Sequence, residues 1–153
     1  MIKMSIKLVL SLLFIILLTG CSEEYITCKI ELNNNKENYT LNSIYKIYYK
    51  DNYVTNITKE DKYSSTDKQI LDYYYEYKNL EYQHFKDIYG GYEYNIDYKN
   101  NVLKIDANIN MEEVNIKKML LDNILDNSYV VGNRLTKTGA KLYYESKGAV
   151  CDI

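Results

Sequence analysis

The chain has 153 residues, with 19 basic side chains, 21 acidic ones and one histidine, and it contains 19 tyrosines, two phenylalanines, no tryptophan and no proline. Because His84 is the only histidine, a metal centre built from several histidines is excluded. The mildly acidic balance argues against nucleic-acid binding, which requires a basic surface.

The N-terminus has the organisation of a secretory signal peptide. Residues 1–7 carry two lysines, residues 8–18 are almost continuously apolar, and the small residues Thr19 and Gly20 follow. A basic segment, an apolar segment of about 7–15 residues and small residues at the cleavage site define such a signal. A membrane-spanning helix needs about 20 apolar residues, so this run is too short to be one.

The cysteine after this segment is predicted to be a lipid attachment site. Leu18-Thr19-Gly20-Cys21 resembles the lipobox of bacterial lipoproteins. That resemblance implies a diacylglyceryl group on the Cys21 thiol, cleavage before Cys21 and a location on the extracytoplasmic face of the cell membrane. Two acyl chains hold a protein on a bilayer stably, whereas one myristoyl-sized chain does not. The alternatives are an ordinary signal peptide whose cleavage site happens to precede a cysteine, and an uncleaved anchor.

Cleavage before Cys21 divides the chain into three predicted parts. Residues 1–20 are the lipoprotein signal peptide, residues 21–25 a lipidated tether and residues 26–153 a single α+β domain. The 133 residues that remain have the usual size of one domain. They carry 17 basic and 21 acidic side chains, and this net charge of −4 argues against a second, polybasic contact with anionic lipid.

Residues 26–63 are predicted to form strands. Residues 26–32 alternate weakly, whereas residues 39–49 alternate strictly, and a period of two is typical of a half-buried strand. Asp51 and Asn52 tolerate a turn with positive φ, and residues 53–63 then return as the second strand of a hairpin. The predicted inward side chains of the first strand are Tyr39, Leu41, Ser43, Tyr45, Ile47 and Tyr49.

A long helix is predicted between Thr66 and Gly90. Thr66 with Gln69 three residues later fits a capping box, and Gly90 supplies a left-handed residue for the C-terminal cap. Apolar and aromatic residues recur at helical spacing, which predicts one broad buried face. That face is predicted to contain Ile70, Tyr73, Tyr74, Tyr77, Leu80 and Ile88.

The period returns to two after Gly91 and predicts a second hairpin, with Asn100-Asn101 as its turn. Asn110 with Glu113 is predicted to cap a short helix, residues 128–131 form a short strand, and a last helix ends at Gly148. This order lacks regular βαβ alternation. The predicted fold class is therefore α+β, an antiparallel sheet built from two hairpins with helices packed on one face. Its predicted inward side chains in the second hairpin are Tyr92, Tyr94, Ile96, Tyr98, Leu103, Ile105, Ala107 and Ile109.

Two cysteines, Cys28 and Cys151, lie near opposite ends of the predicted mature chain. An even pair in an exported domain favours a disulfide over a metal or redox site. Closure of so long a loop contributes about 5 kcal/mol to stability in the chain-entropy model. Two separate buried thiols are the alternative.

No catalytic, cofactor-binding or metal-binding residue is predicted. The sequence contains no nucleophile elbow, P-loop or dinucleotide-binding turn, and His84 lies on the helix pattern as a partly buried packing residue. Carboxylates on the polar face of the second hairpin offer a cation site or an acid–base pair. Lysines on the same face favour a solvated, charge-balanced surface instead. The polar residues concerned are Glu93, Asp97, Asp106 and Asn108, with Lys99 and Lys104.

Tyrosine is the most conspicuous residue type, as in "DYYYEY" and "YEYNIDY". Such rings can fill a core, or they can present plates on which a glycan stacks. Their helix and strand spacing favours the core. Tyr75 is the ring least aligned with the inward helix face, which makes it the candidate for an exposed platform.

The lipobox, Cys28, the "KIYYKDNYVTNI" segment and the closing Gly148-Ala149-Val150-Cys151 together resemble the YehR-type small bacterial lipoproteins, and in particular their low-GC Gram-positive variants. The resemblance covers most of the predicted mature chain. It implies an α+β fold and an extracytoplasmic anchor. It carries over no catalytic residue.

Three functions remain open from the sequence. The predicted one is a non-enzymatic, membrane-anchored module that binds an envelope protein or a cell-wall component, because the chain has a lipobox and no catalytic constellation. The second is a small-ligand or glycan-binding lipoprotein that uses a tyrosine-lined groove. The third is an envelope enzyme, which requires Glu93, Asp97 or Asp106 to share a cleft. Membrane contact through the Cys21 anchor is common to all three.

Overall fold

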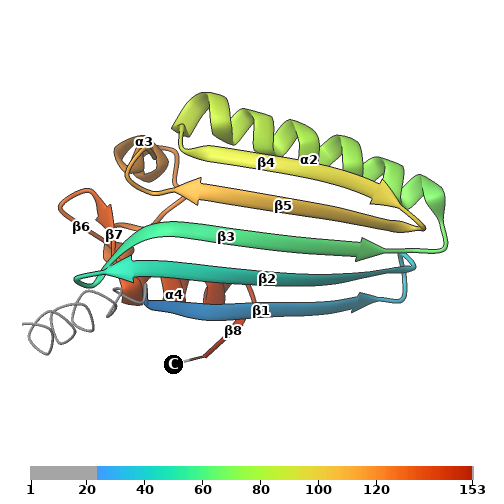
Figure 1. Ribbon diagram of the computed structural model, residues 1–153, viewed down its shortest axis with the longest axis horizontal. Helices are drawn as coiled ribbons and strands as arrows, with labels where there is room; N and C mark the ends of the chain where they lie inside the picture. Colours follow the sequence, from blue (N-terminus) through green and yellow to red (C-terminus); the bar gives the residue numbers. More distant parts are fainter. Residues whose placement is uncertain (1–23, 153) are drawn as a thin grey trace, which may run out of the picture.

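The computed structural model describes residues 24–152, which form one six-stranded antiparallel sheet with helices on one face (Figure 1). The strand order is β4-β5-β3-β2-β1-β8, so the α+β class is confirmed. The strands of this sheet are β1 (Glu24–Asn34), β2 (Tyr39–Lys50), β3 (Tyr53–Ser64), β4 (Tyr92–Lys99), β5 (Val102–Asn110) and β8 (Val150–Cys151). The remaining elements are α2 (Lys68–Tyr89), α3 (Ile116–Leu121), the 3-10 helix η1 (Asn127–Tyr129), α4 (Lys137–Ser146) and the small hairpin β6 (Val130–Val131) and β7 (Arg134–Leu135).

Both predicted hairpins form, and their inner strands pair with each other. Asp51 and Asn52 turn β2 into β3 with φ of 48° and 68°, and Asn100 and Asn101 turn β4 into β5 with φ of 53° and 59°. Asparagine tolerates this left-handed region better than most residues. Strand β5 then pairs with β3 along its whole length, which joins the two hairpins into one sheet.

Strand β1 pairs with β2 along its whole length, on the side of β2 opposite to β3. Its pairing runs from Glu24 opposite Tyr49 to Asn34 opposite Tyr39. The strand therefore begins at Glu24, two residues before the predicted domain boundary. Beyond β1, the edge strand β8 pairs with it, with Cys151 opposite Cys28.

The core lies between the sheet and the helices. Both residues of every second register pair face this side, as where Ile57 of β3 stands between Ile47 of β2 and Ile109 of β5. All three isoleucines are buried. Burial of such side chains stabilises the fold by about 1.5–3 kcal/mol each. We call this side the covered face and the opposite side the open face.

Helix α2 begins one residue later than predicted. Its N-cap is Asp67, whose carboxylate accepts from the backbone N–H of Gln69, whereas the Thr66 hydroxyl accepts from the Asn38 side chain. Asp67 is an equally good N-cap, so the sequence offers two adjacent caps. The helix ends at Gly90 with φ of 69°, as predicted.

The predicted buried face of α2 is wrong, because the observed buried face is rotated from it by about one residue toward the C-terminus. Its buried residues are Leu71, Tyr82 and Tyr89, whereas four of the residues predicted to be inward are exposed. Tyrosines occupy both sides of this helix, so the apolar pattern does not distinguish them. The four exposed residues are Tyr73, Tyr77, Leu80 and Ile88.

Helix α3 also begins later than predicted, because Asn115 caps it by accepting from the N–H of Lys118. The predicted pair of Asn110 and Glu113 does bond side chain to side chain at 2.9 Å, but it stabilises the turn before the helix. The predicted strand near residue 130 is β6, which pairs with β7.

Helix α4 packs on the covered face across β1, β2 and β3 and ends before Gly148, which has φ of 90°. The Gly139 position lies against the backbone of Tyr129, so a larger residue there would collide with η1. After Gly148 the chain returns to β1. Helices α2 and α4 thus cover different halves of one sheet face (Figure 1).

Candidate functional site

A cleft opens on the covered face between the three helices. Its volume is about 440 Å³, within the range of sites for small molecules. Strand β3 supplies its floor, and α2, α3 and α4 supply its walls. Its aromatic lining consists of Tyr45, Tyr82, Phe85, Tyr92, Tyr143 and Tyr144, and its polar lining of Lys59, Lys78, Glu81, Asn123 and Lys147.

An ion pair lies at the floor of this cleft. The Lys59 ammonium is 2.7 Å from an Asp61 oxygen, and the Asp61 side chain is only 1% exposed. Both residues lie on the covered face because Lys59 pairs in register with Tyr45, and Asp61 with Ser43. Burial is the largest single influence on the pKa of Lys59 and lowers it, but the Asp61 carboxylate together with Tyr82 and Tyr45 raises that pKa well above its usual value. Lys59 is therefore charged at neutral pH.

Tyrosine rings surround this pair. The Lys59 nitrogen lies 5.4 Å from the ring centroids of both Tyr45 and Tyr82. The Tyr45 ring packs on Tyr144 at 4.3 Å, and the Tyr82 ring stacks on Tyr94 at 5.2 Å. Cation–π contact adds to the stability of a desolvated ammonium. Burial raises the pKa of Tyr82 to about 12 despite the opposing charge of Lys59, so its hydroxyl keeps its proton at neutral pH.

Two buried polar atoms of this cluster have no hydrogen-bond partner among residues 24–152. They are the Tyr82 hydroxyl, on a side chain 4% exposed, and one Asp61 carboxylate oxygen. A buried polar atom without a partner costs about 1–3 kcal/mol. Tyr82 lines the cleft, and its hydroxyl interacts with the neighbouring Lys59 ammonium, which opposes the rise of the Tyr82 pKa.

The other charges of the cleft are largely balanced. The Lys78 ammonium pairs with Glu81 at 2.6 Å on the α2 side. Lys147 lies at the rim, 5.5 Å from the Tyr143 ring centroid. Lys59 is balanced by Asp61, and within residues 24–152 Lys147 is the one charge of the cleft lining without an ion-pair partner. The cleft thus combines aromatic walls with a nearly neutral polar floor.

The carboxylates of the second hairpin lie on the open face, as predicted, and do not enter this cleft. Lys104 pairs with both Glu60 and Asp106 at 2.9 Å, and hydrogen bonds from Lys62 and Lys104 lower the pKa of Glu60. Glu93, Asp106 and Asn108 line a shallow hollow of about 680 Å³ there. Asp97 pairs in register with Lys104.

Metal chemistry finds no support in the described part of the chain. Within residues 24–152, no group of three or more histidine, cysteine, aspartate or glutamate side chains is placed to hold a metal ion. His84 is exposed on α2, not partly buried as predicted, and its ring meets the edge of Tyr89 at 6.5 Å.

The predicted platform residue Tyr75 is 41% exposed and lies beside Ile96 and Tyr98 in a hollow of about 490 Å³. Two other exposed rings of α2, Tyr73 and Tyr77, stack at 6.0 Å. The exposed tyrosines thus lie outside the cleft, and the rings that line the cleft come from inward positions. The prediction that most tyrosine rings pack in the core is therefore confirmed for the rings at inward positions, and not for the exposed ones.

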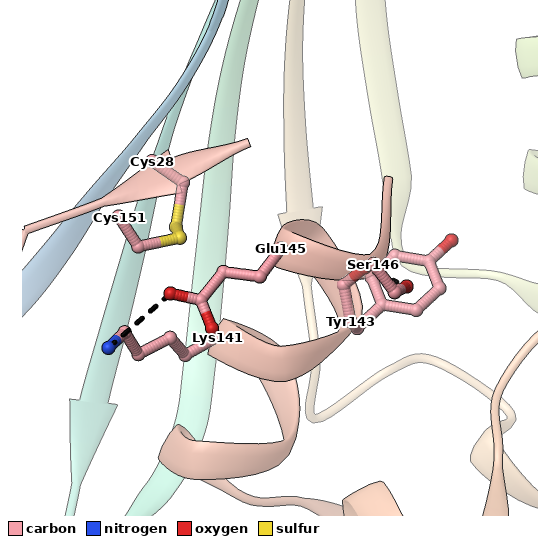
Figure 2. Close-up of a disulfide and its surroundings, with 6 residues drawn as sticks. All are labelled: Cys28, Lys141, Tyr143, Glu145, Ser146 and Cys151. Carbon is pink, nitrogen blue, oxygen red and sulfur yellow. Dashed lines mark hydrogen bonds and ion pairs between the residues drawn. A yellow bond between two sulfur atoms is a disulfide. The ribbon is translucent and has the colours of Figure 1, made fainter. Parts of the chain in front are cut away.

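The two remaining cysteines meet at the edge of the sheet. A disulfide joins Cys28 of β1 to Cys151 of β8, which are paired in register (Figure 2). Helix α4 lies beside them and carries the ion pair of Lys141 and Glu145 at 3.4 Å. Cys21 lies outside the described residues. No helix in the range 24–152 is long and apolar enough to cross a membrane.

Lys59 and Asp61 are not among the site residues that the sequence predicts. They belong to the polar run Lys59-Glu60-Asp61-Lys62, which has the composition of a solvated strand. A signal was nevertheless present. The period of two through the buried Ile57 and Tyr63 places residues 59 and 61 on the same face.

Comparison with known proteins gives a structural match without a family. No family model and no curated protein matches the chain. The NMR structure of the E. coli YehR protein superposes with a TM-score of 0.54, at 18% identity, over 85% of this chain and 92% of that one. The chain has a YehR-like fold. An NMR structure of a protein from Streptococcus pneumoniae TIGR4 is more distant, with a TM-score of 0.46 at 12% identity over 87% and 88% of the two chains. Identity this low extends the YehR likeness to the fold alone.

Proposed function

We propose that this protein is a YehR-type lipoprotein, held on the extracytoplasmic face of the cell membrane by a diacylglyceryl group on Cys21, and that it binds a glycan in the cleft between α2 and α4. The lipobox-like Leu18-Thr19-Gly20-Cys21 supports the anchor. The cleft favours a small ligand over the protein partner that the sequence left open.

The chemistry of the cleft suits an uncharged sugar. Tyrosine offers an apolar plate with a polar tip, and the C–H face of a sugar ring packs on such plates. Because Lys59 and Lys78 are already paired with carboxylates, the cleft does not demand a charged ligand. A volume of about 440 Å³ accommodates a small number of sugar units.

One observation carries this proposal: the Tyr82 hydroxyl is buried in the cleft without a partner. A sugar hydroxyl supplies the missing hydrogen bond. The protein is proposed to bind without catalysis, because the carboxylates that an envelope enzyme would use lie on the open face beside lysines. Glu81, the carboxylate of the cleft, is held by Lys78.

Calorimetric titration of the lipidated protein with chitotriose, a neutral trimer of N-acetylglucosamine, tests the cleft. We expect saturable binding that Tyr82→Phe weakens about three- to tenfold, the effect of one hydrogen bond. Tyr73→Phe, on the exposed side of α2, is the matched control and should bind like the wild type. Equal binding by both variants, or none by the wild type, would refute a glycan site at Tyr82.

Fractionation of producing cells tests the anchor. The wild type should be found in the membrane fraction as a processed form, and Cys21→Ser should be unprocessed or released because it lacks the thiol that carries the lipid. Ser22→Ala keeps the cysteine and serves as the control. A processed Cys21→Ser form that stays in the membrane would contradict the lipoprotein assignment.

A further inference from the structure

The end of the sheet at which β1 begins is rich in tyrosine and positive charge. The β2–β3 turn, the β6–β7 hairpin and the first turn of α4 meet there (Figure 1). The Arg134 guanidinium lies 4.1 Å from the Tyr53 ring centroid. The Lys137 ammonium lies 4.1 Å from the Tyr49 ring centroid and donates to its hydroxyl at 2.9 Å.

Further side chains extend this end onto the open face and the hairpin tip. Tyr25, half exposed, packs on Tyr48 at 5.4 Å, and the Lys46 ammonium lies 5.4 Å from the Tyr25 ring. Val131 is 57% exposed on β6. We call this surface the β1-start end, defined by Tyr25, Lys46, Tyr48, Tyr49, Lys50, Tyr53, Val131, Arg134 and Lys137.

The charge of the β1-start end is opposite to that of the chain. Its segments carry four cations, on Lys46, Lys50, Arg134 and Lys137. They carry two carboxylates, on Glu24 and Asp51, and Asp152 lies beside Thr27, the register partner of Lys46. Across the whole chain, 21 acidic side chains outnumber 19 basic ones. Where β1 begins, four cations thus face three carboxylates, the reverse of the balance of the chain.

We infer that the β1-start end rests on the headgroups of the membrane that holds the anchor. The inference depends on the proposed lipidation of Cys21. Cys21 precedes Glu24 by three residues, which span at most about 10 Å when fully extended. An anchor at Cys21 thus keeps the start of β1 within that distance of the bilayer.

The residues of this end are suited to that position. Tyrosine is enriched at membrane interfaces, where its ring lies among the headgroups and its hydroxyl reaches water. Lysine and arginine near an anionic surface each contribute about fivefold to the binding equilibrium. Strand β1 then leads away from the bilayer, and its far end lies about 30 Å from Glu24. The start of α2 lies at that far end, because Tyr74 packs on Tyr39, the register partner of Asn34.

Single tryptophans test this arrangement, since the chain has none of its own. Val131→Trp reports the β1-start end and Tyr73→Trp reports the start of α2, and both sites are more than half exposed, at 57% and 61%. Each full-length lipidated variant is reconstituted into phosphatidylcholine vesicles containing phosphatidylglycerol and a spin-labelled lipid that quenches tryptophan. We expect Val131→Trp to lose most of its fluorescence and Tyr73→Trp to lose little. Addition of Lys50→Gln and Arg134→Gln to Val131→Trp should weaken quenching in the anionic vesicles and leave it unchanged in pure phosphatidylcholine.

The outcomes separate the inference from its premise. Mass spectrometry first establishes whether Cys21 carries the diacylglyceryl group. A chain without that mass refutes the lipoprotein proposal and, with it, the reason to place the β1-start end at the bilayer. In lipidated protein, equal quenching of the two tryptophans, or stronger quenching of Tyr73→Trp, overturns the inference alone. Quenching that is insensitive to Lys50→Gln and Arg134→Gln overturns the role assigned to the cations.

Discussion

Four consecutive residues of β3, Lys59-Glu60-Asp61-Lys62, form two ion pairs on opposite faces of the same sheet. On the covered face, the side chains of Lys59 and Asp61 are 16% and 1% exposed. On the open face, those of Lys62 and Glu60 are 48% and 32% exposed, and their atoms are 2.8 Å apart, almost the same separation. Each pair joins a lysine to a carboxylate of the same strand at almost the same distance, and the two pairs differ in their surroundings.

The difference shows that the contribution of a charged side chain to stability depends on the face of the strand on which it lies, more than on the residue type. An exposed ion pair is screened by water and contributes about 0–1 kcal/mol. A buried pair contributes little as a pair, but loss of one partner leaves an uncompensated buried charge. The covered-face pair also holds the floor of the cleft, among the rings of Tyr45 and Tyr82.

The largest expected effect comes from neutralising one acid on each face. Asp61→Asn removes the charge that balances Lys59, and we expect it to lower the free energy of unfolding by about 3–5 kcal/mol. Glu60→Gln makes the same chemical change one residue away, and it should cost no more than about 1 kcal/mol. Urea denaturation of the two variants beside the wild type measures both values.

Equal and small losses of stability for Asp61→Asn and Glu60→Gln would contradict the claim that burial on the covered face makes the loss of one partner costly. A sharper version replaces both members of the buried pair. Lys59→Met combined with Asp61→Leu should be close to neutral or stabilising, because buried pairs are often replaced by apolar residues without loss. A loss in the double variant as large as in Asp61→Asn would show that the pair itself stabilises the fold.

The covered face also holds the buried sulfur of Cys28, joined to Cys151 at the sheet edge. Replacement of both cysteines by alanine should lower the free energy of unfolding by about 2–5 kcal/mol, since the disulfide closes a loop of more than a hundred residues. Denaturation midpoints test this, with the reduced wild type as the matched control. An intact mass unchanged by reduction and alkylation of the unfolded chain would contradict the disulfide.

The covered face should also make the fold sensitive to alkali. The pKa values of Lys59 and Tyr82 are raised in the folded chain, so the folded state binds these protons more tightly than the unfolded state. Their contribution is complete below the unfolded pKa values, about 10, and is lost as the pH rises from there toward the folded values. We expect the urea midpoint to fall above about pH 10. The Lys59→Met, Asp61→Leu variant should show a shallower fall, and an identical fall would exclude a role for Lys59.

The smallest expected effect on stability belongs to Tyr82→Phe. Removal of a buried hydroxyl without a partner should leave the free energy of unfolding unchanged or raise it by up to about 1 kcal/mol. The same variant is expected to weaken glycan binding. A clear loss of stability would instead indicate that the hydroxyl has a structural partner, and a thermal melt of Tyr82→Phe beside Tyr73→Phe distinguishes the two outcomes.

Much of the fold follows from local pattern. The period of two in β2, β4 and β5, the asparagine turns and Gly90 all act within a few residues of the chain, and each forms as predicted. The pairing of β5 with β3 and the choice of α2 face depend on contacts between distant residues. Apolar and aromatic residues lie on both sides of α2, so composition gives no preference, and packing against the sheet selects Leu71 and Tyr82.

The candidate site was harder to predict, because its chemistry comes from residues that look solvated. Lys59 and Asp61 are charged, and their burial requires each other and the surrounding tyrosines. The sequence could predict their face from the period of two, but not that α2, α3 and α4 leave a cleft above them. The position of such a gap depends on how helices end and turn.

The most direct test of the central claim is to locate the bound ligand on the protein. Titration of isotope-labelled lipidated protein with chitotriose, followed by the chemical shifts of its backbone amides, reports every residue that the ligand affects. We expect shifts concentrated at Lys59, Tyr82 and Tyr144 around the cleft, with open-face positions away from it, such as Asp97 and Lys104, unchanged. Shifts concentrated on the open face, or none at saturating chitotriose, would contradict it.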